Sequence, residues 1–239
     1  MDNNLFRFFA NCPKNMGELS AQEIKELGGT DIKTAPAGVS FSGSLETVYR
    51  MLIWSRISGR IFLELSNFEA ETPDSIYINT GKIDWQQEMD LDTSFSISCD
   101  LINSTVVNHP NFASQRVKDA IVDQFRNKTG ERPSVDTENP NLKIHLLLKY
   151  NRGTLSIEIS GNSLHKRGYR KSGGPATLKE NLAAALLIRS RWEKIAEKGG
   201  SFLDLFCGTG TLPIEAALIA GDIAPALISK SKGPTGWLK

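Results

Sequence analysis

Apolar and polar positions in the first 70 residues predict an alternation of short strands and helices. Apolar segments at 5–11, 37–43 and 57–70 are expected to be strands, and in the last two the apolar residues recur at every second position. Residues 16–29 and 44–56 instead repeat apolar residues every three to four positions, which predicts helices. Gly28-Gly29 ends the first helix and Ser44 can cap the second. This strand-helix-strand-helix-strand order favours a small α+β unit.

The middle of the chain predicts a second α+β unit. A short helix is expected at 75–85, a strand at 93–105 and a long helix at 112–130. Ser114 is the expected N-cap of that long helix and Gly130 its end. Its expected buried stripe consists of Val117, Ala120, Ile121 and Phe125. Residues 141–150 and 153–161 are joined by a short glycine-bearing connection, so they predict a hairpin.

The last third predicts one long helix, a buried strand and a second helix. Residues 177–200 form the long helix, with Leu182, Leu186 and Ile195 on its inner side. Residues 201–206 are apolar without alternation, which is typical of a parallel strand buried on both faces. A helix is expected at 212–221, and 222–239 is expected to be a loop.

Composition narrows the class of protein. The chain has 239 residues, 40% of them hydrophobic and 23% charged, which suits one large or two small globular domains. It has neither an apolar run of about 18 residues nor a secretory signal pattern. The three cysteines, Cys12, Cys99 and Cys207, are too far apart for a zinc pair or a disulfide framework. We therefore expect a cytoplasmic protein with no metal site and no membrane partner.

Charge divides the chain into an acidic and a basic part. Residues 1–92 carry 8 Lys and Arg against 14 Asp and Glu, whereas residues 93–239 carry 20 against 13. Such an asymmetry indicates a polyanionic partner for the basic part. An ordinary solvated surface explains the same numbers.

The segment "SFLDLFCGTGTLPIEAA", residues 201–217, carries the chemistry. Gly208 and Gly210 let the backbone turn sharply, and a helix starting near Thr211 offers free N–H groups to a ligand. It is neither a phosphate loop nor a dinucleotide fingerprint, because Pro213 occupies the third glycine position. With Asp204 before the turn, the pattern suits a ligand such as S-adenosylmethionine. The alternative is a turn that binds nothing.

The segment "LHKRGYRK", residues 164–171, is the main candidate for nucleic-acid contact. Arginine and tyrosine stack on unpaired bases and lysine meets phosphates. Its candidate residues are His165, Lys166, Arg167, Tyr169, Arg170 and Lys171. The helix at 112–130 adds Arg116 and Lys118, a weaker signal because Asp119 and Asp123 lie beside them. A solvated basic loop is the alternative.

These motifs together resemble a known family. "DLFCGTGTLPIEAA" is similar to the first cofactor motif of class I S-adenosylmethionine-dependent methyltransferases. "LHKRGYR" and "PATLKENLAAALL" resemble the entry to the methylase domain of the THUMP-containing guanine-N2 methyltransferases of bacterial large-subunit ribosomal RNA. "FASQRVKDAIVDQFR" resembles a helix of their THUMP domain, and "VYRMLIWSRISGRI" the unit before it. The similarity covers nearly the whole chain in the same order.

The resemblance implies an α+β fold in three parts. These are an N-terminal ferredoxin-like unit (1–69), a THUMP domain (70–160) that binds structured RNA, and the first βα unit of a Rossmann-like α/β methyltransferase domain (161–239). It implies an S-adenosylmethionine pocket lined by Asp204, Phe206, Cys207, Gly208, Thr209, Gly210 and Thr211, closed by Pro175, Thr177 and Leu178. The implied partner is large-subunit ribosomal RNA.

The family's catalytic tetrapeptide, Asn-Pro-Pro-aromatic, is absent from this sequence, and the resemblance places it beyond Lys239. "ENPN" at 138–141 lacks the second proline and the aromatic residue, and the acid expected after a second methylase strand is missing too. We therefore expect the N-terminal portion of a longer methyltransferase, with no catalytic residue of its own, that binds RNA without methylating it. Two alternatives stay open: an adenine-specific DNA methylase and a non-catalytic RNA-binding module.

Overall fold

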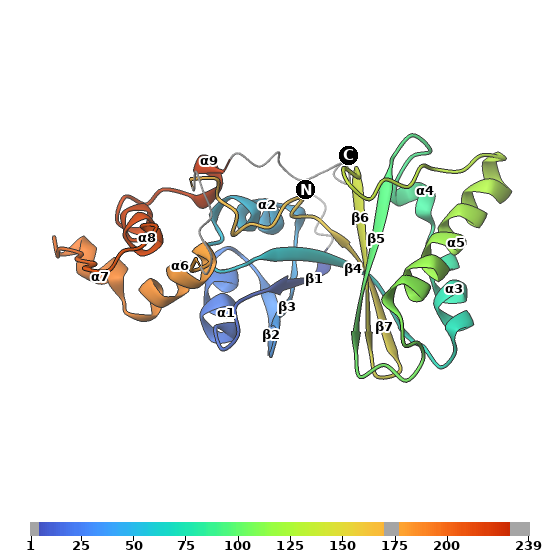
Figure 1. Cartoon of the computed structure of the whole chain (residues 1–239), viewed down its shortest axis with the longest axis horizontal. Coiled ribbons are helices and arrows are strands. Elements are labelled where there is room, and N and C mark those ends of the chain that lie inside the picture. Colours follow the sequence, from blue (N-terminus) through green and yellow to red (C-terminus); the bar gives the residue numbers. More distant parts are fainter. Residues whose placement is uncertain (1–4, 170–176, 230–239) are drawn as a thin grey trace. The chain divides into compact units, whose positions relative to one another are not determined.

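The computed structural model describes residues 5–169 and 177–229 (Figure 1). The chain divides into two compact units. The first unit runs to Ile61 and resumes at Asn162, and the second takes the residues between, Phe62–Gly161. Strand β4 (Arg60–Glu69) starts at the end of the first stretch and continues into the second unit. The predicted domain boundaries at residues 69 and 160 stay predictions.

The N-terminal part of the first unit has the strand and helix order of a ferredoxin-like fold. Its elements are β1 (Phe6–Asn11), α1 (Gly17–Glu26), β2 (Thr30–Ala35), β3 (Gly38–Gly43) and α2 (Leu45–Trp54), and β4 follows them. The strands pair antiparallel in the order β2-β3-β1, and both helices pack against β3. Ser44 caps α2, as predicted, by accepting a hydrogen bond from the Thr47 N–H.

Strand β2 is a strand that the apolar pattern did not predict. It is an exposed edge strand with Ile32 as its one aliphatic residue larger than alanine, and its pairing with β3 shifts register between Thr30 and Lys33. An edge strand needs no apolar face, so periodicity gives no signal there.

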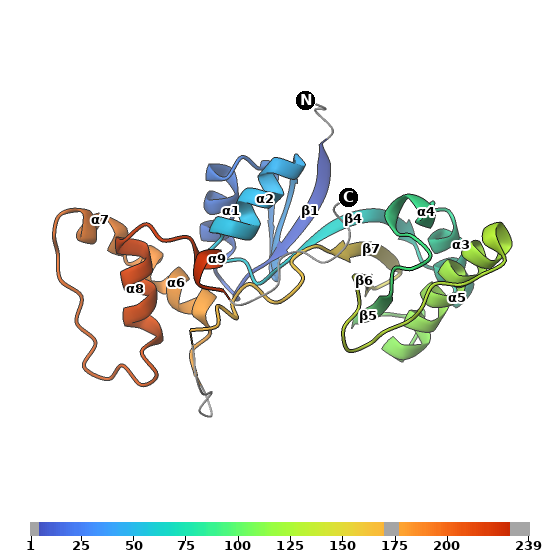
Figure 2. The ribbon, with the colours of Figure 1, turned by 90° about the horizontal axis from the view of Figure 1, so that it is seen from above.

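The later part of the first unit is a small helical layer. It contains α6 (Glu180–Arg189), α7 (Trp192–Glu197), α8 (Thr211–Ala220) and the short α9 (Pro225–Ile228). Helix α8 packs against α6 and α7, α6 contacts α1, and α9 contacts α2 (Figures 1 and 2). Leu187, Trp192 and Ala216 form one core cluster, and Met16, Ile57 and Ala185 form another. The second cluster joins the N-terminal segment to α6. Helix α9 lies where a loop was predicted.

The single long helix predicted over 177–200 is wrong. The backbone breaks at Arg191, which adopts a left-handed conformation with φ of 59°, and so separates α6 from α7. Leu182 packs against the core as predicted, but Leu186 and Ile195 are 40% and 46% exposed. The break changes the helical register between α6 and α7, so the predicted stripe does not continue from α6 to Ile195.

Residues 201–206 do not form the predicted strand. Leu203, Leu205 and Phe206 are 79%, 76% and 93% exposed, and the segment has no regular secondary structure. A strand that is apolar on both faces needs neighbouring strands and covering helices. The described part of the chain offers this segment no such neighbours.

The second unit is a four-stranded sheet with helices on one face. Beyond β4 it contains α3 (Pro73–Gly81), α4 (Trp85–Glu88), β5 (Phe95–Ile102), α5 (Pro110–Thr129), β6 (Leu142–Lys149) and β7 (Arg152–Glu158). The strand order is β4-β7-β6-β5, with β5 and β6 parallel. Helices α3 and α5 pack side by side, and α5 covers β5 (Figure 1). The predicted hairpin is confirmed as β6 and β7.

Two details of the predicted second unit are wrong. Helix α5 starts at Pro110 with His109 as its N-cap, because proline at the first helical position is well tolerated, so Ser114 lies inside the helix. Residues 75–85 contain parts of two helices, α3 and α4, rather than one helix. The predicted α5 stripe is confirmed, since Val117, Ala120, Ile121 and Phe125 are all buried.

Candidate functional site

The glycine turn lies directly before α8. Gly208 and Gly210 have φ of 53° and 77°, the left-handed region that favours glycine. A Cβ on Gly208 would meet no atom within 4 Å, so this side of the turn is open. The Gly210 N–H donates to the Cys207 carbonyl at 2.8 Å, which closes the turn. Gly210 is the N-cap of α8 and supplies no side-chain cap. The turn and the start of the helix therefore present backbone to a ligand.

The residues around the turn differ in exposure. Phe206, Cys207 and Thr209 are exposed, whereas Thr211 is buried at the start of α8. The Asp204 Oδ1 accepts a hydrogen bond from the Phe206 N–H at 3.1 Å, so this carboxylate shapes the approach to the turn. Its partly buried position leaves it accessible to a ligand.

Thr177 and Leu178 are partly buried and come just before α6, which packs against α8. This packing is what connects their segment to the glycine turn. Pro175 lies outside the described residues.

The catalytic tetrapeptide was expected beyond Lys239, and Lys239 itself lies outside the described residues, which end at Ser229. The site described here consists of the glycine turn, the start of α8 and the groups that hold this helix.

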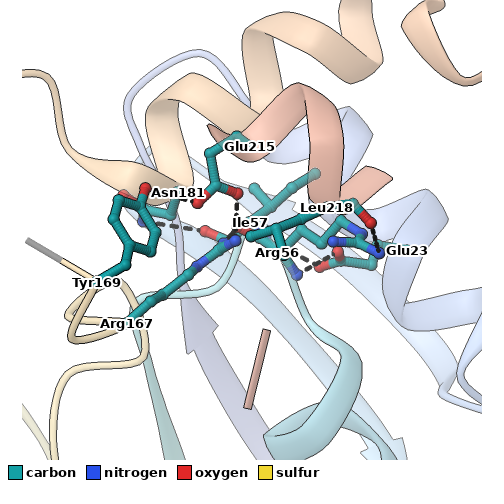
Figure 3. A network of polar contacts seen from close by, with 8 residues as sticks. All are labelled: Glu23, Arg56, Ile57, Arg167, Tyr169, Asn181, Glu215 and Leu218. Atoms are coloured by element: carbon teal, nitrogen blue, oxygen red, sulfur yellow. Dashed lines mark hydrogen bonds and ion pairs between the residues drawn. The ribbon is translucent and has the colours of Figure 1, made fainter. Parts of the chain in front are cut away.

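A buried polar network contacts α8 through Glu215 and Leu218 (Figure 3). The Arg167 guanidinium donates from Nη1 to Glu215 Oε2 and from Nη2 to the Arg56 carbonyl, the latter at 2.6 Å. The Tyr169 hydroxyl donates to Glu215 Oε1 at 2.8 Å. Both members of the Arg167–Glu215 ion pair are buried, with side chains 1% and 0% exposed. The network thus takes both carboxylate oxygens of Glu215.

The N-terminal segment contributes its own polar groups to this network. Glu23 on α1 accepts from the Ser55 hydroxyl at 2.7 Å and the Arg56 N–H at 2.6 Å. The Asn181 side-chain amide on α6 donates to the Ile57 carbonyl at 3.1 Å. Arg56 Nη2 reaches the Leu218 carbonyl of α8 at 3.5 Å. Residues 55–57 are therefore held from α1, α6 and α8.

Burial governs the electrostatics of these groups. It raises the pKa of the Glu215 carboxyl, against the opposing effect of Arg167. Burial also raises the pKa of Glu23, and together with the Glu215 charge it raises the pKa of Tyr169. Burial lowers the pKa of Arg56. In such low-dielectric surroundings, a charged side chain is stable only when an oppositely charged or hydrogen-bonding group lies beside it.

Sequence reasoning missed Glu23, Arg56 and Glu215. Glu215 carried a usable signal, since it is the one charged residue in the apolar helix "TLPIEAALIA". A lone acid on a buried helix requires a cationic or hydrogen-bonding partner from elsewhere. The pattern could not say which arginine supplies it.

Three family profiles match the chain in succession. Residues 7–62 match the RlmL ferredoxin-like domain, residues 70–158 the THUMP domain, and residues 167–234 the RMKL-like methyltransferase domain. These three matches show a ferredoxin-like domain, a THUMP domain and part of a methyltransferase domain, in this order along the chain.

Curated relatives agree with these matches. A ribosomal RNA large subunit methyltransferase K/L of Syntrophotalea carbinolica is 44% identical over 98% of this chain and 32% of its own length. The protein of the same name from Desulfotalea psychrophila is 46% identical over 97% of this chain and 32% of its own length. The chain therefore spans about a third of the length of the curated relatives it matches.

Solved structures share the fold. A protein described as a predicted N6-adenine-specific DNA methylase from Listeria monocytogenes is 31% identical with a TM-score of 0.82, covering 93% of this chain and 57% of that one. A putative methyltransferase, SMU.472, complexed with SAH, is 26% identical with a TM-score of 0.85, covering 100% of this chain and 62% of that one.

The basic segment that precedes the methyltransferase helices differs from the expected exposed loop. Arg167 is buried in the network with Glu215, so its guanidinium is not presented to a ligand. Lys166 is exposed, and His165 is partly buried with its Nδ1 2.7 Å from the Ser163 hydroxyl. Burial lowers the pKa of His165. Tyr169 is also engaged with Glu215. Arg170 and Lys171 lie outside the described residues.

The predicted cations of the THUMP domain are paired with acids. Arg116 forms an ion pair with Asp74 and lies 5.2 Å from the centre of the Tyr77 ring. Lys118 Nζ lies 2.9 Å from Asp119. A cavity of about 410 Å³ beside α5 is lined by Lys118, Arg126 and Arg132 together with Asp119 and Asp123. The surface of α5 therefore mixes both signs of charge.

Residues 5–169 and 177–229 offer neither a cluster of metal-ligating side chains nor a helix able to span a membrane. Within these ranges, no cluster of three or more His, Cys, Asp or Glu side chains is placed to hold a metal ion. Of the helices described there, none combines the length and apolar character needed to cross a membrane.

Proposed function

We propose that this chain is the portion of a ribosomal RNA methyltransferase that recognises the RNA substrate and contains the first part of the cofactor-binding site. The whole enzyme transfers a methyl group from S-adenosylmethionine to the N2 amino group of a guanine in 23S ribosomal RNA. The succession of ferredoxin-like, THUMP and methyltransferase profiles carries this proposal. The names of the curated relatives support the ribosomal RNA substrate. The division at residues 69 and 160 is part of the proposal.

The glycine turn fits the cofactor. Its left-handed glycines and open Gly208 side allow a ligand to approach the backbone closely, and the solved SMU.472 relative is complexed with SAH. The turn residues from Asp204 to Thr211, with Pro175, Thr177 and Leu178, would hold the cofactor there. When bound, S-adenosylmethionine supplies an electrophilic methyl group on a positively charged sulfur.

The chain's own residues act by positioning. Backbone N–H groups at the start of α8 and the Asp204 carboxylate orient the ligand, and positioning supplies much of the acceleration in such a transfer. The sequence has no Asn-Pro-Pro-aromatic motif to place a base amino group against the methyl. We therefore propose that these 239 residues bind RNA but do not methylate it.

The test of inactivity is transfer of a labelled methyl group to ribosomal RNA by the purified chain. The expected result is no transfer above a no-protein control, together with weak or absent S-adenosylmethionine binding by calorimetry. Micromolar cofactor affinity or measurable transfer would refute this part of the proposal.

The test of RNA recognition is fluorescence anisotropy with a ribosomal RNA hairpin and a DNA duplex of equal length across a salt series. Phosphate contacts make the logarithm of the binding constant fall with the logarithm of the salt concentration, with a slope of about −0.7 to −0.9 per contact. We expect tighter binding to RNA, weakened by Lys166→Ala or Arg170→Ala. Lys33→Ala, an exposed lysine on β2, is the matched control. Preference for DNA would instead favour the adenine-specific DNA methylase that the Listeria relative's name describes.

A further inference from the structure

Arg167 joins two segments that are distant in sequence. Its Nη1 donates to Glu215 on α8, and its Nη2 donates to the carbonyl of Arg56, which follows α2. Figure 3 shows the guanidinium lying between these two partners. Arg56 belongs to the ferredoxin-like match and Glu215 to the methyltransferase match. One side chain therefore bridges the two domains inside the first unit.

A second contact fixes the same helix one turn further along. Arg56 Nη2 reaches the Leu218 carbonyl, so α8 is held at Glu215 and at Leu218. The Tyr169 hydroxyl donates to the other Glu215 oxygen, so both carboxylate oxygens are engaged. Two points of attachment determine both the position and the rotation of a short helix.

This attachment lies close to the glycine turn around Gly208 and Gly210, called the cofactor turn below. Glu215 is four residues after Thr211, and at about 1.5 Å per residue it lies roughly 6 Å along the helix from the end of the turn. A helix is stiff over one turn because of its hydrogen bonds. Holding Glu215 therefore also holds Gly208 and Gly210, whose left-handed conformations make the turn.

A buried ion pair suits this role better than apolar packing would. Its partners must stay together, because separating them leaves a buried charge uncompensated. The ion pair therefore forms in only one relative placement of the ferredoxin-like and methyltransferase domains. Apolar contacts are non-directional and would allow sliding.

We propose that Arg167 and Glu215 are positioning residues that hold α8, and with it the cofactor turn, in a fixed placement on the ferredoxin-like domain. Arg167 acts through Glu215 and the Arg56 carbonyl, and it does not contact RNA. The name cofactor turn rests on the proposed function. The placement of α8 itself does not.

Hydrogen–deuterium exchange of the 239-residue chain, without RNA or cofactor, tests this proposal. In Arg167→Met we expect the amides of residues 211–220 to exchange at least tenfold faster, with β1 and β3 unchanged. Lys166→Met removes the same charge from the neighbouring exposed residue and should leave α8 exchange unchanged. Unchanged α8 exchange in Arg167→Met, or an equal change in Lys166→Met, would overturn the proposal.

The variant Arg167→Lys distinguishes two roles of Arg167: contact with both partners at once, and neutralisation of the Glu215 charge. Lysine keeps the charge opposite Glu215 but lacks the planar fork that reaches both partners. A bridging role predicts that α8 exchange stays fast in this variant, whereas complete rescue by lysine would mean that charge compensation alone matters and would contradict the bridge.

A folded reference is available if Arg167→Met proves unstable. Arg167→Met combined with Glu215→Leu removes both buried charges together, which proteins generally tolerate. Faster α8 exchange in this folded double variant supports the bridge, and wild-type exchange rejects it. Failure of RNA or cofactor binding in any variant would concern the proposed function alone, since the exchange measurement uses neither ligand.

Discussion

Single side chains in this protein differ sharply in accessibility even where their residue types agree. Cys207 is exposed in the glycine turn, whereas Cys12 and Cys99 are partly buried. Arg167 is enclosed while Lys166 beside it is exposed. Burial therefore decides which of two chemically similar residues can meet a reagent or a ligand, and a sequence motif alone does not report it.

The cysteines provide one check of this difference. Burial raises the pKa of Cys99 to about 12 and also raises that of Cys12, so both carry little reactive thiolate near neutral pH. With iodoacetamide at pH 8, we expect Cys207 to be labelled at least tenfold faster than Cys99, as followed by peptide mass spectrometry. The contrast should vanish in denaturant. Equal rates in the folded chain would contradict the described burial.

Glu23 provides a pH-dependent check. Burial raises its pKa above the ordinary value of 4.5, so the folded chain binds this proton more tightly than the unfolded chain. Its contribution to stability is therefore full below pH 4.5 and is lost as the pH rises through the raised pKa.

We expect the free energy of unfolding of wild type, relative to Glu23→Gln, to fall between pH 4.5 and 7 in urea titrations. Glu18→Gln, an exposed acid on the same helix, is the control for the loss of one charge. A constant difference across this range would show that the carboxyl titrates normally.

At the scale of elements, the stability of α8 depends on a partner far away in sequence. The helix is apolar apart from Thr211 and Glu215, and its attachment combines the core cluster of Leu187, Trp192 and Ala216 with the buried ion pair. The Trp192 indole N–H also donates to the Ala216 carbonyl at 2.8 Å. Apolar packing supplies the attraction and the polar contacts supply the placement.

A double-mutant cycle tests this division. Arg167→Met alone or Glu215→Leu alone should destabilise the chain by about 3–5 kcal/mol, because each leaves one buried charge without a partner. The double variant should recover most of that loss. Urea unfolding followed by circular dichroism measures all four proteins. Additive losses would show that the two side chains do not interact.

Elements that bury one face were the most predictable from the sequence. The stripe of α5 and the hairpin of β6 and β7 show their periodicity directly. The exposed edge strand β2 has no such pattern, and the break at Arg191 has no glycine or proline to mark it. For the candidate site, the glycines of the turn were evident, but the pairing of Arg167 with Glu215 depends on a tertiary contact that local pattern cannot encode.

At the scale of the whole molecule, the two units differ in continuity. The second unit is built on one stretch of chain, Phe62–Gly161, and the first is assembled from two stretches that flank it. The Ile57 side chain packs with Ala185, and the Arg56 carbonyl accepts from Arg167. The N-terminal stretch alone therefore lacks the Ala185 contact of Ile57 and the Arg167 donor to the Arg56 carbonyl.

We accordingly expect a fragment of residues 62–161 to unfold cooperatively in urea, because it contains its own sheet and its helices. A fragment of residues 1–61 should show no cooperative unfolding transition. The fragment of residues 62–161 should unfold cooperatively without a separate fragment of residues 162–239. A non-cooperative 62–161 fragment would show that this unit depends on the rest of the chain.

The insertion of one unit within the other also sets an order during synthesis. About one hundred residues separate Ile61 from Asn162, and a ribosome adding roughly 5–20 residues per second needs several seconds to make them. The inserted unit can complete its sheet in that interval. During the same time the Arg56 carbonyl has no contact with Arg167, because Arg167 has not yet been synthesised. The newly made N-terminal segment thus spends those seconds with an unmatched polar surface, which makes it the stage at which a chaperone would be most useful.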